Sequence, residues 1–341
     1  MNDAPDKIAP TGANGLLRAC AAAITMAALL CSTAGARAQG INFDAAEILT
    51  QKLAANFYVL TGSPAVDPGH PEAAGGRIGV LVGPDGVFMV DATYAPLTDK
   101  VVAAIRKLSP APIRFLVNTH SHPDHTGGNP NFARLGTLVL AREEVWRTMS
   151  QPLLPAIAVA IGNAASTTDP SRLPVATYGL GDRLGFHLNG ETIEVIALPP
   201  AHTDGDSMVW FEKADVIMIG DFYRNYGYPF VDAAHGGSFE GVLEALDAVL
   251  KLAGPNTKLV PGHGTIVTRK DIPAYRDMIV DVESSVKQMI EHGKNKQDVL
   301  AAKVTARYDA SVSGGAASLP AGQGTSADRF VSEVYDELAN K

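Results

Sequence analysis

The stretch of sequence that decides the fold is Thr119-His120-Ser121-His122-Pro123-Asp124-His125-Thr126-Gly127-Gly128. It places three histidines and an aspartate within six residues, and these side chains are common ligands of first-row metals. Because His120 and His122 are two positions apart, their side chains leave the same face of an extended backbone. Pro123 is expected to bar a regular helix, so that Asp124 and His125 turn toward a neighbouring position. Two pairs of ligands side by side suit two metal ions rather than one.

Three more candidate ligands each follow an apolar run that is typical of a strand. His202 comes after residues 191–197, Asp221 after residues 216–219, and His263 after residues 258–260. Loops at the ends of strands, along one edge of a sheet, are where such folds assemble their active sites. The sequence therefore predicts that these three residues join the first motif.

Outward from these motifs, short apolar runs alternate with stretches of helical periodicity, which is typical of α/β architecture. Strands are expected at residues 57–60, 78–82, 87–90, 113–118, 137–141, 183–188, 191–197, 208–211, 216–219 and 258–260. Helices are expected at residues 96–108, 142–151, 239–252, 270–292 and 329–340. The apolar, proline-punctuated residues 152–177 suggest an insert over a site, and the Gly/Ser/Ala-rich residues 311–327 suggest a linker.

Composition limits how a metal can be held. The chain has 341 residues, with two cysteines against nine histidines and a formal net charge of −8. The negative charge argues against nucleic acid and anionic lipid as partners. Cys20 and Cys31 cannot form a disulfide framework or a four-cysteine zinc site, so nitrogen and oxygen atoms must hold any metal.

The N-terminus has the three regions of a cleavable signal peptide in the right order. Lys7 and Arg18 precede an uncharged run at residues 19–31, and Ala36-Arg37-Ala38 forms an A-x-A cleavage pattern. The run is too short to span a bilayer, which takes about 20 residues. We expect residues 1–38 to be removed, leaving a periplasmic or secreted protein that begins at Gln39, has no cysteine and has no membrane anchor.

The run His120-x-His122-x-Asp124-His125, followed by His202, Asp221 and His263, resembles the metallo-β-lactamase superfamily. The resemblance spans about residues 56–288 and implies a four-layer αββα sandwich with a dinuclear site at one edge of the two sheets. It implies two Zn²⁺ ions, although imidazole and carboxylate ligands also accept iron or manganese. By position, His120, His122 and His202 would bind the first metal, Asp124, His125 and His263 the second, with Asp221 bridging. Asp124 would also orient the water and carry a proton to the leaving group.

The type of residue at the bridging position helps to indicate the class of substrate. Many β-lactamases carry cysteine there, whereas Asp221 resembles the branch of thioesterases, lactonases and other ester-cleaving enzymes. Arg224 follows where many cysteine-type β-lactamases keep a lysine for the substrate carboxylate, and arginine can bind a carboxylate bidentately. Tyr223 and Tyr226 would line the same pocket. The alternative for Arg224 is a solvated loop charge or a partner of Asp232.

The resemblance also suggests roles for Asp91 and for residues 61–76. Asp91 ends a buried strand and resembles an aspartate that braces the ligand loop by hydrogen bonds, a plain turn cap being the alternative. Residues 61–76 resemble a flap over the site, or form an ordinary surface loop. The remaining histidines, His70, His187, His235 and His292, show no partner pattern.

The first hypothesis for function is an exported dinuclear zinc hydrolase in which metal-bound hydroxide cleaves an ester, thioester, lactone or amide-type bond of a small molecule. The alternatives are a periplasmic β-lactamase with an aspartate-bridged zinc site, an iron-dependent sulfur dioxygenase of the same fold, and a zinc-binding protein without turnover. In each case residues 39–310 would form the catalytic domain, and residues 311–341 a linker with a C-terminal helix.

Overall fold

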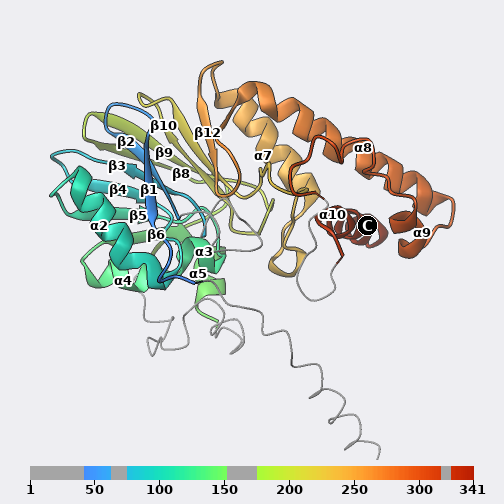
Figure 1. Ribbon diagram of the computed structural model, residues 1–341, viewed down its shortest axis with the longest axis horizontal. Coiled ribbons are helices and arrows are strands. Elements are labelled where there is room, and N and C mark those ends of the chain that lie inside the picture. The colour runs from blue at the N-terminus through green and yellow to red at the C-terminus, as the bar shows by residue number, and fades with distance from the viewer. Residues whose placement is uncertain (1–41, 63–74, 152–174, 316–323) are drawn as a thin grey trace, which may run out of the picture. The chain divides into compact units, whose positions relative to one another are not determined.

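The computed structural model describes residues 42–62, 75–151, 175–315 and 324–341 (Figure 1). The described residues all belong to one compact unit, Ile41–Lys341. The predicted signal peptide lies outside the described residues, as do most of the predicted flap and of the predicted insert. Among the helices of the described ranges, none combines the length and the apolar character needed to cross a membrane.

The first sheet has seven strands in the order β1-β2-β3-β4-β5-β6-β7. They are β1 (Ile48–Lys52), β2 (Phe57–Gly62), β3 (Ile78–Leu81), β4 (Val87–Val90), β5 (Ile113–Val117), β6 (Leu138–Arg142) and β7 (Val175–Tyr178). Neighbours are antiparallel from β1 to β4 and parallel from β4 to β7. Every residue of β3 and β4 is buried, which is typical of a strand that is covered on both faces.

The second sheet has six strands in the order β13-β12-β11-β10-β9-β8. They are β8 (Arg183–Leu188), β9 (Glu191–Ala197), β10 (Ser207–Phe211), β11 (Val216–Gly220), β12 (Lys258–Pro261) and β13 (Val267–Thr268). β11 and β12 are parallel and the other neighbours antiparallel. Along β9 buried and partly buried residues alternate, because successive side chains point to opposite faces of the sheet.

Three hydrophobic clusters define the layers of the fold. Between the sheets, the rings of Phe57 and Phe211 lie 4.5 Å apart. Outside the first sheet pack α2 (Thr98–Leu108) and α4 (Asn129–Arg134); outside the second pack α7 (Phe239–Leu252), α8 (Ile272–Glu291) and α10 (Ser326–Ala339). The order helix, sheet, sheet, helix confirms the predicted αββα sandwich.

Most predicted elements are present, and β4, β8, β9 and α7 have the predicted bounds. Among the described residues, the strands β1, β7 and β13 and the helices α3 (Pro123–Thr126), α4 and α9 (Lys296–Ala301) lie outside the predicted ranges. β7 takes up the last residues of the predicted insert, and α5 (Glu143–Met149) is shorter than expected.

The expectation that Pro123 bars a helix is wrong. Pro123 is the first residue of the short helix α3 (Pro123–Thr126), and His122 precedes it in extended conformation. Proline is well suited to the first turn of a helix, since its missing N–H has no partner there and its φ is already helical. The helix turns Asp124 and His125 back toward the strand ends.

Candidate metal centre

The seven predicted ligands come together at one edge of the two sheets. His120 and His122 follow β5, Asp124 and His125 lie in α3, and His202, Asp221 and His263 lie in the loops after β9, β11 and β12. These residues are far apart in the sequence, but the strands that precede them end at the same edge, which brings the seven side chains together. Most of these side chains are fully or almost fully buried.

The ligand atoms form two adjacent groups, each with all members within 4.8 Å of one another. One group is His120, His122 and His202; the other is Asp124, His125 and His263. In the first, His202 Nε2 lies 3.0 Å from His122 Nδ1, and in the second His263 Nε2 lies 2.9 Å from Asp124 Oδ2. These are the two sets that the family resemblance assigns to two metals.

Asp221 lies between the groups. One of its oxygens, Oδ1, is 3.4 Å from His125 Nε2, and the other, Oδ2, is 3.4 Å from His263 Nε2 and 3.9 Å from His202 Nε2. It also falls within 4.8 Å of both His120 and His125. A carboxylate in this place reaches both groups, as a bridging ligand must, and bridging stays a prediction.

Four histidines use one ring nitrogen for a protein partner and turn the other toward the centre. The partnered atoms are His120 Nδ1 with Thr119 Oγ1 at 3.1 Å, His122 Nε2 with Asp232 at 2.8 Å, His125 Nδ1 with Asp91 at 2.8 Å, and His202 Nδ1 with the Phe230 carbonyl at 2.9 Å. Metal-binding histidines are held in this way, because the second hydrogen bond fixes the tautomer and the ring orientation.

Three buried atoms at the centre fit the ligand set of a cation. Among the described residues, His120 Nε2, His125 Nε2 and Asp221 Oδ1 have no hydrogen-bond partner. A buried polar atom without a partner costs about 1–3 kcal/mol, so native proteins rarely leave one unused. Their lone pairs are the donor atoms that a divalent metal needs, and the residues present therefore fit a metal.

The pKa values of the histidines also suit a metal centre, because two imidazoles are held neutral and a third lies among carboxylates. Burial lowers the pKa of His202 to about 3 and that of His120 well below its usual range, with help from neighbouring imidazoles. The pKa of His125 rises to about 10 although burial alone would lower it, because Asp124, Asp221 and Asp91 surround the ring. The carboxylates thus stabilise a cation in the second group.

Glycines let the backbone approach the ligands closely. A Cβ on Gly262 would overlap the Asp221 carboxylate and lie 2.7 Å from His125 Cε1. A Cβ on Gly76 would overlap the His125 ring from the β3 side. These two glycines therefore leave space for the side chains of the predicted ligands.

Asp91 lies where the resemblance placed it, next to the ligand loop. Besides its contact with His125, its carboxylate accepts hydrogen bonds from the N–H and the hydroxyl of Thr119, at 2.7 and 2.8 Å. Asp91 has a φ of +64°, a conformation that aspartate and asparagine tolerate better than most residues.

Sequence reasoning missed Asp232, His235 and Phe230. Asp232 Oδ2 lies 2.8 Å from His122 Nε2 and 2.7 Å from His235 Nδ1, so His235 does have a partner, although 46% of its side chain is exposed. The sequence suggests Asp232 only as a partner of Arg224. The signal was weak, since an aspartate and a histidine three residues apart in a loop are common on protein surfaces.

The three predicted substrate-binding residues lie close to the centre along the chain but differ in setting. Tyr223 is buried, with its ring 4.5 Å from that of Tyr275 in the core outside the second sheet. Arg224 is buried as well, and its Nε donates to the Tyr226 carbonyl at 3.1 Å. Tyr226 is half-buried beside Gly314. Their role in substrate binding stays a prediction.

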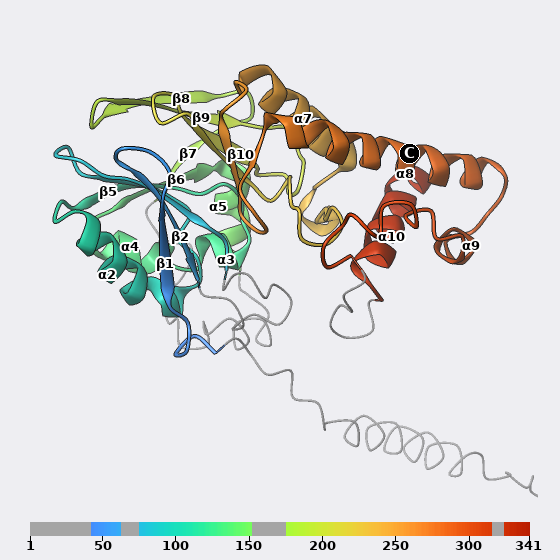
Figure 2. The same cartoon turned by 45° about the horizontal axis from the view of Figure 1, so that its top comes forward.

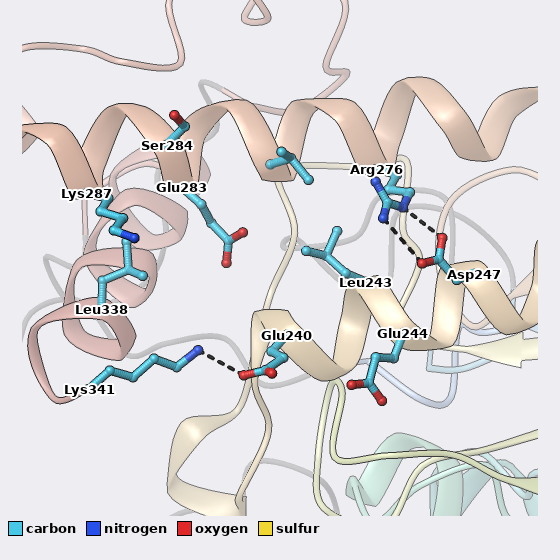
Figure 3. A pocket seen from close by; sticks show the side chains of 11 residues that line it. Glu240, Leu243, Glu244, Asp247, Arg276, Glu283, Ser284, Lys287, Leu338 and Lys341 are labelled. Carbon is cyan, nitrogen blue, oxygen red and sulfur yellow. Dashed lines mark hydrogen bonds and ion pairs between the residues drawn. The ribbon is translucent and has the colours of Figure 1, made fainter.

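A separate open groove of about 570 Å³ lies between α7, α8 and α10 (Figure 3). It is lined by Leu243, Val280 and Leu338 together with charged residues, which include Glu240, Glu283 and Lys341. None of the predicted site residues lines it.

The fold and the metal centre together define a known class of protein. The sequence model of the metallo-β-lactamase superfamily matches residues 73–263, more than half of the chain, and the chain belongs to that family. Within the matched residues lie the histidine and aspartate groups that are able to hold metal.

Solved structures agree on the fold. The DIM-1 metallo-β-lactamase superposes with a TM-score of 0.51 at 18% identity, over 68% of this chain and 96% of that one. A metallo-β-lactamase from Pontibacter korlensis gives 0.51 at 18% identity, over 68% and 99%. At such low identity the likeness concerns the fold alone.

One curated relative is the 2,4-dinitroanisole O-demethylase subunit alpha of Nocardioides sp. (strain JS1661). It is 27% identical over 152 residues, which are 42% of this chain and 42% of that protein. The match therefore spans less than half of the relative's length.

Proposed function

We propose that this chain is an exported hydrolase that holds two Zn²⁺ ions and cleaves an ester, thioester, lactone or amide-type bond of a small molecule. The observation that carries the proposal is the pair of adjacent three-residue groups, His120-His122-His202 and Asp124-His125-His263, with Asp221 reaching both. A single metal would use only one of these groups.

Bound there, two divalent cations would supply a nucleophile at neutral pH and polarise a substrate carbonyl. The protein's own residues define the side from which a substrate approaches. Asp124 and His122 are 16% and 20% exposed, whereas His120, His125 and His202 are fully buried. The opening of the centre is therefore on the side of Asp124 and His122.

Asp124 is the residue placed to manage protons at this opening. Its Oδ2 accepts a hydrogen bond from His263 Nε2, and its pKa lies well below the usual range: burial would raise it, but His125 and His263 outweigh that effect. The carboxylate is thus ionised at neutral pH and can accept a hydrogen bond from the attacking water. Its place at the opening, not its pKa, supports the role of orienting this water and carrying a proton to the leaving group.

Aspartate rather than cysteine at position 221 supports the ester-cleaving branch. All seven predicted ligands are nitrogen or oxygen donors, and both cysteines lie in the predicted signal peptide. β-Lactam hydrolysis with an aspartate-bridged site is the nearest alternative. Nitrogen and oxygen ligands also suit iron, which is why a sulfur dioxygenase is an outcome of the test.

Metal analysis of the purified protein, followed by a substrate panel, tests the proposal. The panel comprises an aryl ester, a lactone, a glutathione thioester, nitrocefin, and a nitrophenyl methyl ether chosen for the demethylase relative. We expect about two zinc ions per chain and hydrolysis of at least one carbonyl substrate. His122→Ala should abolish hydrolysis and lower the amount of bound zinc. Iron with oxygen consumption on a persulfide would overturn the hydrolase proposal, as would full activity in metal-free protein.

Export is a separate part of the proposal and needs its own test. Sequencing the N-terminus of protein recovered from the periplasm or the medium should give Gln39 as the first residue. A protein that keeps Lys7 and Arg18 and stays in the cytoplasm would contradict it.

A further inference from the structure

Residues 228–232 form a segment outside any helix or strand that holds two ligands of the metal centre. The Phe230 carbonyl accepts a hydrogen bond from His202 Nδ1 at 2.9 Å, and Asp232 Oδ2 lies 2.8 Å from His122 Nε2. The backbone of the segment adds a third tie, from Asp232 N–H to the His202 carbonyl at 2.8 Å. The orientation of two imidazoles in the first group therefore depends on where this segment lies.

The C-terminal helix α10 holds the same segment through other atoms. Ser326 Oγ accepts from the Tyr228 N–H at 2.7 Å, and Glu333 Oε2 accepts from the Val231 N–H at 3.2 Å. The Arg329 guanidinium lies 4.4 Å from the centre of the Phe230 ring. Because the segment has no strand partner, side chains of α10 take the place of the sheet hydrogen bonds that its backbone lacks.

α10 is itself firmly attached. Phe330 stacks on Tyr228 with ring centres 5.7 Å apart and packs edge-on against Phe239 of α7. Thr325 and Asp328 form a capping box at the first turn of the helix, and α10 lies against α8 (Figure 2). The helix lies beyond residues 73–263, which the family model matches.

We propose that α10 is a positioning element of the metal centre, in which Glu333 holds residues 230–232 and thereby keeps His122 and His202 in the orientation that binds zinc. The inference rests on the proposed metal site and goes beyond it, because it assigns a role to a helix without a ligand of its own. Arg329 supports Glu333 from one turn earlier, with its Nε 3.4 Å from Glu333 Oε1.

Zinc affinity of the full-length protein tests this role directly. The apoprotein is titrated with Zn²⁺ against a chromogenic chelator, and wild type is compared with Glu333→Ala. We expect the dissociation constant of one zinc ion to rise about tenfold and that of the other zinc ion to stay unchanged. A tenfold rise is at the low end of what is found when a metal ligand loses its hydrogen-bond partner. Glu333→Gln keeps an acceptor oxygen and should restore the wild-type value.

The chain offers a matched control on the same helix. Glu337 is as buried as Glu333, at 16% against 18% exposure, and accepts a comparable hydrogen bond from the Phe239 N–H at 2.7 Å. That contact caps α7 instead of holding residues 230–232. Glu337→Ala should therefore lower the melting temperature while leaving both zinc affinities unchanged.

The outcomes separate this inference from the proposed function. Equal zinc affinities in wild type and Glu333→Ala overturn the inference alone, as does an equal loss in Glu333→Ala and Glu337→Ala. A wild type that binds no zinc overturns both. If Glu333→Ala does not fold, Glu333→Asp carries the test, since it keeps the charge beside Arg329 but is one methylene too short to reach Val231.

Discussion

Asp91 Oδ2 lies 2.8 Å from His125 Nδ1, and both side chains are buried. The same carboxylate holds the N–H and hydroxyl of Thr119, the residue just before His120. One aspartate therefore orients a ligand of the second group and fixes the backbone that leads into the first. Asp232 is its counterpart on the other side of the centre, where it holds His122.

Replacing Asp91 with asparagine should weaken zinc binding without unfolding the loop. Asparagine tolerates the φ of +64° and keeps the shape of the side chain, but it removes the negative charge beside His125. We expect a loss of about 10–100-fold in the affinity for one zinc ion, measured by chelator competition. Asp99→Asn, at an exposed aspartate of α2, is the control and should bind zinc as the wild type does. An unchanged affinity in Asp91→Asn would show that the contact does not tune the ligand.

Asp232→Asn should weaken the other zinc ion. Asp232 contacts His122 of the first group, whereas Asp91 contacts His125 of the second. Because the two changes act on different ligands, the double variant should lose affinity for both ions, each by about the factor seen in the single variant. Chelator competition on all four proteins measures this. If both single variants weakened the same zinc ion, the assignment of ligands to two groups would be wrong.

Asp124→Asn should lower kcat even when the zinc sites are fully occupied. Asp124 is a predicted ligand and the carboxylate nearest the opening, so the variant is assayed at saturating zinc with its metal content checked. Loss of general acid–base catalysis typically lowers kcat about 10²–10⁴-fold. An unchanged kcat at full zinc occupancy would remove Asp124 from the proton-transfer role.

The convergence of the seven predicted ligands was predictable from sequence, because each of them follows a strand with a clear apolar pattern. The same holds for local turns: Asn189 and Gly190 have φ values of +53° and +73°, as the two-residue hairpin between β8 and β9 requires. Such features depend on a few neighbouring residues, and the sequence shows all of them at once.

The partners of the ligands were not predictable in this way. Asp232 is 110 residues from His122, and Glu333 is 102 residues from Val231, so no local pattern connects them. β1 lies at the edge of its sheet and most of its residues are exposed, so it lacks the apolar run that marks the inner strands. Long-range packing decides these features, and only the folded chain brings them together.

Gly262→Ala adds a single methyl group and should lower both the stability of the protein and its zinc content. The new Cβ would overlap the Asp221 carboxylate and crowd the His125 ring, so one of them must move. Overpacking of this kind costs about 1–3 kcal/mol, and the shift should reduce zinc content as well. Thermal unfolding and metal analysis measure both effects. Gly185→Ala in β8 is the control, since nothing lies within 4 Å of its Cβ position; equal behaviour of the two variants would contradict the crowding.

Glu283, in the groove between α7, α8 and α10, should make stability depend on pH. Figure 3 shows its carboxylate in the space between the helices, and burial, followed by Glu337 and Glu240, raises its pKa from 4.5 to about 7, against the effect of Lys341. Since the folded state binds the proton more tightly than the unfolded state, stability falls as the pH rises from about 4.5 to 7. Glu283→Gln cannot ionise and should gain about 1 kcal/mol over the wild type at pH 8, after allowance for solvent screening, and little at pH 4. Denaturant unfolding at the two pH values measures the difference, and a gain of equal size at both would assign the effect to packing instead of charge.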